Sequence, residues 1–112
     1  MYDVIVVGAR CAGAPVAMLL ARRGYRVLLV DRATFPSDTL STHFIKPPGV
    51  AMLRRWGLLD QVVASGCPPV RRFRFDYGAV VLAGSPPPLD GGGECYAPRR
   101  TILDSILVEA AA

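Results

Sequence analysis

The stretch Asp3–Asp31 constrains the fold of this chain more than any other. It begins with the apolar run Val4–Val7, which is short and rich in β-branched residues and therefore predicts a fully buried parallel strand. A glycine turn over residues 8–13 follows, and then a helix is expected over Ala14–Arg23, ended by the next glycine. A second strand is predicted over Arg26–Val30. Strand, glycine turn, helix and strand together predict the βαβ unit that binds dinucleotides.

The glycine turn and the acid after the second strand each have a physical role in such a unit. Gly8 allows a tight turn out of the strand, and Gly13 allows the helix to pack closely on the sheet. The helix start offers N–H groups and about half an elementary positive charge to a pyrophosphate. Asp31 lies 18 residues after Gly13, near the spacing of about 20 expected for a carboxylate that binds the ribose. This carboxylate would repel a 2′-phosphate, so a nucleotide with a free ribose is favoured over NADP. The residues predicted to bind the cofactor here are Gly8, Ala9, Arg10, Cys11, Ala12, Gly13 and Asp31.

One position departs from the G-x-G-x-x-G pattern, because Arg10 replaces the middle glycine. That glycine normally lets the backbone approach the pyrophosphate, so the arginine side chain must point away from the ligand or wrap around it. Arg32, next to the ribose acid, is either an adenosine contact or a surface arginine. The alternative for the whole unit is a βαβ fold whose glycines serve packing alone.

The composition is that of a small globular domain. The chain has 112 residues, of which 52% are hydrophobic and 20% charged, so it has enough apolar residues for one core. The longest uncharged apolar run, residues 11–21, is too short to span a bilayer, and no membrane segment is predicted. The amino terminus has no basic lead of a secretory signal, so a cytoplasmic location is expected.

The charged and metal-binding residue types exclude several classes of site. The net charge of +4 comes mainly from arginines in scattered pairs, which does not indicate a nucleic-acid surface. The cysteines Cys11, Cys67 and Cys95 are widely spaced, so neither a disulfide framework nor a metal site is predicted. His43 has no acid or base beside it in the sequence and is interpreted as a hydrogen-bonded structural group. No catalytic side chain is predicted.

The remainder of the chain predicts packing elements. Helices are expected over Gly49–Trp56 and Leu58–Ser65, each ended by a glycine. Alternating residues predict a half-exposed strand over Val70–Asp76, which forms a hairpin with a strand over Ala79–Ala83.

A last helix is predicted from Thr101, with Asp104 completing a capping-box-like pattern. Its expected apolar face consists of Ile102, Leu103, Ile106 and Leu107. Arg99 and Arg100 lie at the start of this helix, where two cations are unfavourable unless an anion is nearby. Arg100 is therefore either a second phosphate or flavin contact or one of two exposed arginines.

Taken together, the chain resembles the amino-terminal part of the FAD-dependent oxidoreductases related to para-hydroxybenzoate hydroxylase and to geranylgeranyl reductases. The motifs that carry the resemblance are Asp3–Gly13, Gly24–Arg32, the Gly57-Leu58 helix break and Arg99–Asp104 with Leu107. The resemblance implies an α/β fold: a Rossmann-like FAD-binding βαβ unit with additional helices and a β-hairpin, incomplete relative to the family fold. It also implies that Gly8 and Gly13 hold the FAD pyrophosphate, Asp31 the adenosine ribose, and Arg100 the cofactor.

The resemblance further implies a flavin monooxygenase or reductase that takes electrons from NADH or NADPH. The family's later Asp-Gly and Gly-Asp segments and its substrate-binding sheet have no counterpart in residues 1–112, and the sequence ends within a helical pattern. We therefore expect residues 1–112 to be the amino-terminal part of an FAD-binding domain, a fragment without independent turnover. The alternatives are an NAD-binding Rossmann protein and a noncatalytic nucleotide-binding module. The sequence does not identify the substrate.

Overall fold

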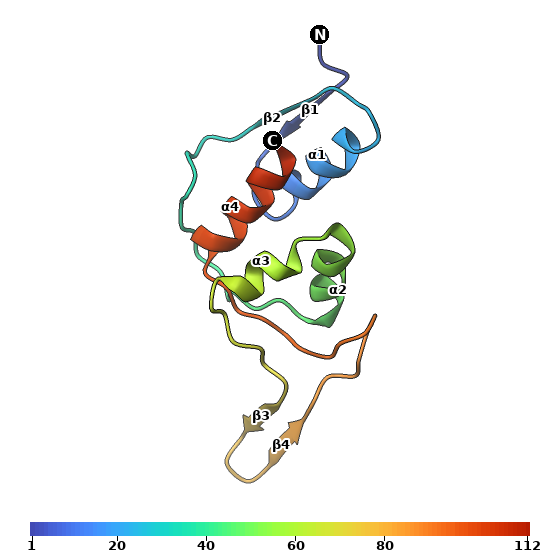
Figure 1. Cartoon of the computed structure of the whole chain (residues 1–112). Helices are drawn as coiled ribbons and strands as arrows, with labels where there is room; N and C mark the ends of the chain where they lie inside the picture. The colour runs from blue at the N-terminus through green and yellow to red at the C-terminus, as the bar shows by residue number, and fades with distance from the viewer. The chain divides into compact units, whose positions relative to one another are not determined.

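The computed structural model describes residues 1–112, which form two compact units (Figure 1). The first unit comprises residues 1–40 and 99–112, and the second comprises residues 41–98. The elements of the first unit are β1 (Val4–Val7), α1 (Gly13–Ala21), β2 (Val27–Val30) and α4 (Arg100–Ala111), and those of the second are α2 (Pro47–Trp56), α3 (Leu59–Ala64), β3 (Phe73–Asp76) and β4 (Val81–Gly84).

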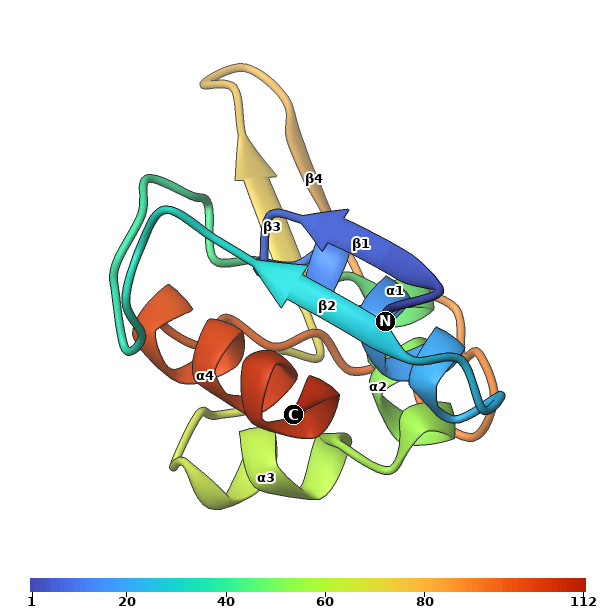
Figure 2. The same ribbon diagram turned by 90° about the horizontal axis from the view of Figure 1, so that it is seen from above.

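The first unit is built on the predicted βαβ arrangement. Strand β1 (Val4–Val7) pairs in parallel with β2 (Val27–Val30), so that Val4 lies opposite Val27 and Val7 opposite Val30. Helix α1 (Gly13–Ala21) connects the two strands and packs against both of them. Figure 2 shows the two strands side by side. This register brings the residues after each strand, Gly8 and Asp31, to the same edge of the sheet, which confirms the predicted topology.

The prediction that the first strand is fully buried is wrong. The side chains of β1 alternate between half-buried and exposed, and Ile5 and Val7 are 63% and 83% exposed. An apolar run of this kind predicts full burial because parallel sheets are usually covered on both faces. In this chain the sheet has two strands, and α1 covers the face that bears Val4 and Val6.

Helix α4 (Arg100–Ala111) packs against α1 through the buried residues Leu103, Ile106 and Leu107. The predicted capping box is wrong: the residue at the N-cap position is Arg99, and no side chain caps the helix. The Asp104 carboxylate bonds arginine side chains instead, because it lies on the buried face of the helix.

The second unit contains the two predicted helices and the predicted hairpin. Helix α2 (Pro47–Trp56) ends at Gly57, which adopts a left-handed conformation with φ of 78°, and α3 (Leu59–Ala64) follows. Strands β3 (Phe73–Asp76) and β4 (Val81–Gly84) pair antiparallel. The core side chains of this unit are Val50, Ala51, Leu53, Leu58, Val62, Cys95 and Tyr96.

The hairpin is more exposed than the sequence predicted. Every residue of β4 is exposed, and in β3 only Phe73 is half-buried, through ring contacts with Phe44 and Phe75. No helix in the structure has the length and apolarity that crossing a bilayer requires.

Candidate functional site

A cleft of about 500 Å³ lies at the carboxyl edge of the β1–β2 sheet. Its volume falls in the range of about 300–1,000 Å³ that is typical of small-molecule sites. The residues lining it are Val7, Gly8, Arg10, Val30, Asp31 and Arg32. Four of these, Gly8, Arg10, Asp31 and Arg32, belong to the set predicted to bind a cofactor. Ligands of open α/β sheets bind at this edge of the strands.

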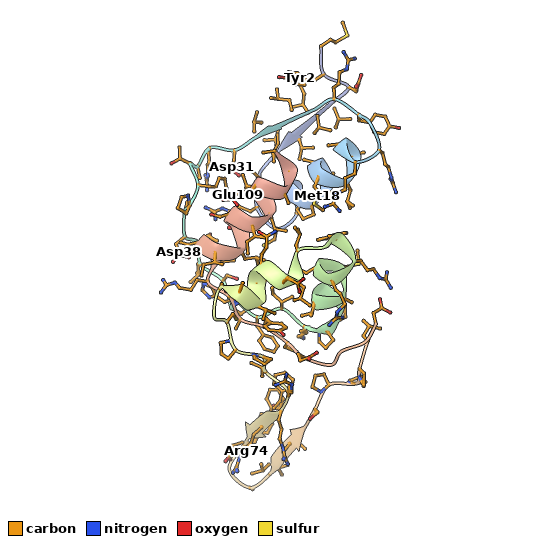
Figure 3. All side chains as sticks on the ribbon, viewed as in Figure 1. Tyr2, Met18, Asp31, Asp38, Arg74 and Glu109 are labelled. Atoms are coloured by element: carbon orange, nitrogen blue, oxygen red, sulfur yellow. The ribbon has the colours of Figure 1, made fainter.

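Asp31, which is labelled in Figure 3, anchors the glycine turn as well as lining the cleft. Its Oδ2 accepts the backbone N–H of Ala9 at 2.7 Å, and its Oδ1 accepts the backbone N–H of Ala33 at 2.8 Å. These two bonds, with the charges of Arg10 and Arg32, hold the pKa of Asp31 below its ordinary value. An ionised carboxylate accepts up to about four hydrogen bonds, so Asp31 retains acceptor sites for donor groups of a ligand.

The two glycines of the turn are required by geometry. Gly8 has a φ of +102°, and its N–H bonds the carbonyl of Val30 at 2.7 Å. A Cβ on Gly13 would lie 1.6 Å from the carbonyl oxygen of Gly8, so no side chain fits there. Ala12, at the N-cap position of α1, has no polar side chain, and no side chain caps this helix. The N–H of Ala14 is already bonded to the carbonyl of Arg10 at 3.0 Å, and Pro15 has no N–H, so the N–H of Gly13 is the donor that the first turn of α1 can offer to an external anion.

The Arg10 side chain forms hydrogen bonds with the segment after β2 and with α4. Its Nη2 donates to Ser37 Oγ at 2.7 Å, and its Nη1 donates to Asp104 Oδ2 at 2.5 Å. The guanidinium also lies 5.3 Å from the centre of the Phe35 ring, within the range of a cation–π contact. The side chain is 26% exposed and still lines the cleft. Arg10 thus wraps around the edge of the site, one of the two outcomes expected for a side chain at this position.

The residue at the centre of these contacts is Asp104, which the sequence did not predict as a site residue. Its side chain is completely buried, and its Oδ1 accepts the Nε–H of Arg100 at 2.8 Å. A signal for it was present: Asp104 lies three residues before Leu107, on the apolar face of the helix, where an acid must be paired.

Arg99 and Arg100 each form an ion pair with an aspartate of this chain. Arg100 is bonded to Asp104 and does not line the cleft, so the structure does not bring it together with Asp31. This bond is the main cause that raises the pKa of Arg100. Arg99 pairs at 3.2 Å with Asp38, which lies beside the start of α4 (Figure 3). The contact of Arg100 with a cofactor stays a prediction.

Cys11 lies next to the same cluster. Its Sγ is 3.4 Å from Asp104 Oδ1, although the residue as a whole is exposed. Desolvation of the thiol, reinforced by the Asp104 charge and opposed by Arg100, raises the pKa of Cys11. A thiol of raised pKa is mostly protonated at neutral pH, which does not suit a nucleophile.

His43 belongs to the second unit and differs from its predicted role. Its Nε2 is buried without a hydrogen-bond partner, whereas a hydrogen-bonded structural group was expected. The residue also has a left-handed φ of 60°, and its backbone N–H donates to Ser41 Oγ at 3.1 Å. The structure shows no catalytic partner for this side chain.

Comparisons with known proteins agree on one family. The FAD binding domain family matches residues 1–109. The chain is 32% identical over 108 residues to 6-methylpretetramide 4-monooxygenase from Streptomyces rimosus and 46% identical over 56 residues to menaquinone reductase from Mycobacterium tuberculosis. These matches cover 94% and 50% of this chain. Its structure superposes on the myxobacterial chondrochloren halogenase CndH, an FAD-dependent halogenase, with a TM-score of 0.86 and 29% identity over 98% of the chain.

All three proteins are much longer than this chain. The matched region is 26% of the monooxygenase, 14% of the reductase and 26% of the halogenase. The chain therefore spans about a quarter or less of the length of these proteins.

Proposed function

Because the chain belongs to the FAD binding domain family, we propose that its cleft holds the adenosine diphosphate half of FAD and that residues 1–112 form the amino-terminal part of the FAD-binding domain of a flavin-dependent monooxygenase. The observation that carries the proposal is the position of Asp31, an ionised acid that lines the cleft and is bonded to the glycine turn. A ribose at Asp31 would direct the diphosphate toward the N–H groups at the start of α1.

The residues present fit this ligand. Gly8 and Gly13 leave no side chain between the sheet edge and the helix start, where the diphosphate would lie. Arg10 and Arg32 line the cleft with Asp31, which gives these three side chains a net charge of +1 that suits an anionic group. Bound FAD supplies the redox chemistry, and the chain supplies binding and orientation.

The activity of the parent protein is part of the same proposal. Both a monooxygenase and a reductase are among the relatives, and the monooxygenase match covers nearly the whole chain, which favours oxygen transfer to a small organic substrate. Reduction of a double bond is the second candidate. NADH or NADPH as electron donor and a cytoplasmic location stay predictions from the sequence.

The proposal is tested by titrating the chain with FAD and following flavin fluorescence and the visible absorbance. We expect saturable binding of FAD and competition by ADP. Saturable binding of NAD with no binding of FAD would favour the NAD-binding alternative and contradict the proposal.

The Asp31→Ala substitution tests the ribose contact. We expect the dissociation constant for FAD to rise about 10-fold, because a charged hydrogen bond is lost. The matched control is Asp3→Ala, which removes an acid from an exposed ion pair with Arg26 in the same unit. An Asp31→Ala chain that binds FAD as tightly as the control would remove Asp31 from the site.

A further inference from the structure

Asp104 is buried in the first unit and binds two cations at once. Its side chain has no exposed surface, and its two carboxylate oxygens are divided between Arg10, at 2.5 Å, and Arg100, at 2.8 Å. The two arginines come from the glycine turn and from the first residue of α4, which are separated by about 90 positions in the chain. One acid thus fixes the glycine turn to the start of a distant helix.

The charges in this cluster do not cancel. Two guanidinium groups share one carboxylate, so the cluster carries a net charge of +1 close to the positive end of α1. The bonds of Arg10 use its two terminal nitrogens, which leaves its Nε–H free to donate. Because the Arg10 side chain is partly exposed at the cleft, this donor and its charge are available to a ligand.

Burial of the Asp104 carboxylate requires desolvation of a charge, which is unfavourable. An apolar side chain on the face shared with Leu103 and Leu107 would pack between α1 and α4 without desolvating a charge. The carboxylate is therefore better explained by what it holds in place than by the stability of the helix contact.

We propose that Asp104 is a positioning residue that holds Arg10 at the edge of the cleft, so that Arg10 binds the diphosphate of the nucleotide. The inference rests on the proposed function, because it requires a nucleotide diphosphate beside the glycine turn. At the position where the pattern has its middle glycine, the Arg10 side chain would bind the anion. Asp104 would act through Arg10 and would not contact the ligand.

If Asp104 positions Arg10, the expected change in diphosphate affinity is opposite in sign to the change expected from charge alone. The Asp104→Asn substitution removes a negative charge near an anionic ligand, which by charge alone would tighten binding. If Asp104 positions Arg10, the same substitution releases the guanidinium, and binding of a diphosphate weakens.

The experiment compares ADP with adenosine by isothermal titration of the full chain. For Asp104→Asn we expect affinity for ADP to fall about 10-fold, with the affinity for adenosine unchanged. The control is Asp3→Asn, which makes the same change in charge at the exposed pair with Arg26 and should leave both affinities unchanged. Asp104→Glu, which retains the carboxylate, should recover part of the loss.

Two further variants test the same inference if Asp104→Asn does not fold. Ser37→Ala removes the other side chain that accepts a hydrogen bond from Arg10 and leaves the longer bonds to the carbonyls of Ser37 and Asp38, so it should weaken ADP binding about 3-fold. Arg10→Lys retains the charge but loses the forked geometry, and it should weaken ADP more than adenosine.

The outcomes separate the inference from the function on which it rests. An Asp104→Asn chain that binds ADP as tightly as the natural chain, or more tightly, overturns the positioning role while the proposed function stands. An equal loss of ADP and adenosine affinity also overturns it, because that result indicates a structural role alone. A natural chain that binds neither ADP nor FAD contradicts the proposed function itself.

Discussion

At the residue scale, the site depends on side chains that both hold the glycine turn in place and line the cleft. Asp31 fixes the turn through the N–H of Ala9 and lines the cleft with its remaining acceptor sites. Arg10 joins the turn to Ser37 and Asp104 and also lines the cleft. Substituting either residue changes both the shape of the site and its charge. Interpretation of a variant therefore requires a stability measurement beside the binding measurement.

The Asp31 carboxylate sets a pH limit for the turn. Because its hydrogen bonds depress the pKa of Asp31 in the folded chain, the stabilisation is complete above the unfolded pKa of about 3.9 and is lost as the pH falls through the lower folded pKa. We expect the difference in thermal midpoint between the natural chain and Asp31→Asn to be constant from about pH 7 to 5 and to shrink below about pH 4. A difference that already shrinks between pH 7 and 6 would contradict this assignment.

Gly13 is the residue at which a methyl group is least tolerated. The added Cβ would overlap the carbonyl of Gly8, which is backbone and cannot rotate away. We expect Gly13→Ala to lower the free energy of unfolding by about 3 kcal/mol. The control is Gly84→Ala, where no atom lies within 4 Å of the added group and stability should not fall. Urea unfolding of both variants checks the expectation.

At the element scale, α1 is the element that joins the sheet to α4. It contacts β1, β2 and α4, and its buried residues include Ala14, Ala17 and Met18. The small alanines allow close packing, and Met18 is the largest fully buried side chain of this helix. The opposite face of the sheet, with Ile5 and Val7, has no such cover in this chain.

This asymmetry predicts a large difference between neighbouring positions of α1. Met18 (labelled in Figure 3) is 1% exposed, so Met18→Ala should lower the free energy of unfolding by about 2–5 kcal/mol. Val16 is 49% exposed, and Val16→Ala should cost less than about 1 kcal/mol. Equal losses in denaturant unfolding would show that α1 does not pack as described.

At the scale of the whole molecule, the chain contains the nucleotide-binding part of a larger architecture. It matches the FAD binding domain family over residues 1–109 and spans 26% of the halogenase that it superposes on. Within the first unit lie the cleft that we propose holds the adenosine diphosphate half of FAD and the arginine cluster around Asp104. A catalytic side chain is not assigned in either unit.

We therefore expect the chain to bind FAD without turnover. Mixed with FAD and with NADH or NADPH, it should oxidise the nicotinamide no faster than free FAD does, because binding and orientation of the adenosine half do not place a donor or a substrate at the flavin. The measurement is the loss of absorbance of the reduced nicotinamide. A rate clearly above that of free FAD would show that the chain forms a working active site.

Local pattern was sufficient to predict the elements that depend on nearby residues. The β-branched run, the glycine turn and the spacing to Asp31 predicted β1, α1 and β2 with their parallel pairing, and the glycines at helix ends predicted α2 and α3. These features follow from backbone conformation and from residues close in sequence, which a pattern contains directly.

Only the tertiary structure decided which faces are covered and which charges meet. The exposure of Val7 depends on the absence of a second layer over the sheet, and the pairing of Arg10 with Asp104 joins residues far apart in the chain. The sequence assigned Asp104 to a helix cap because that role requires only neighbours. Its burial against Arg10 and Arg100 is set by the packing of α4 on α1, a contact between distant segments that local spacing does not contain.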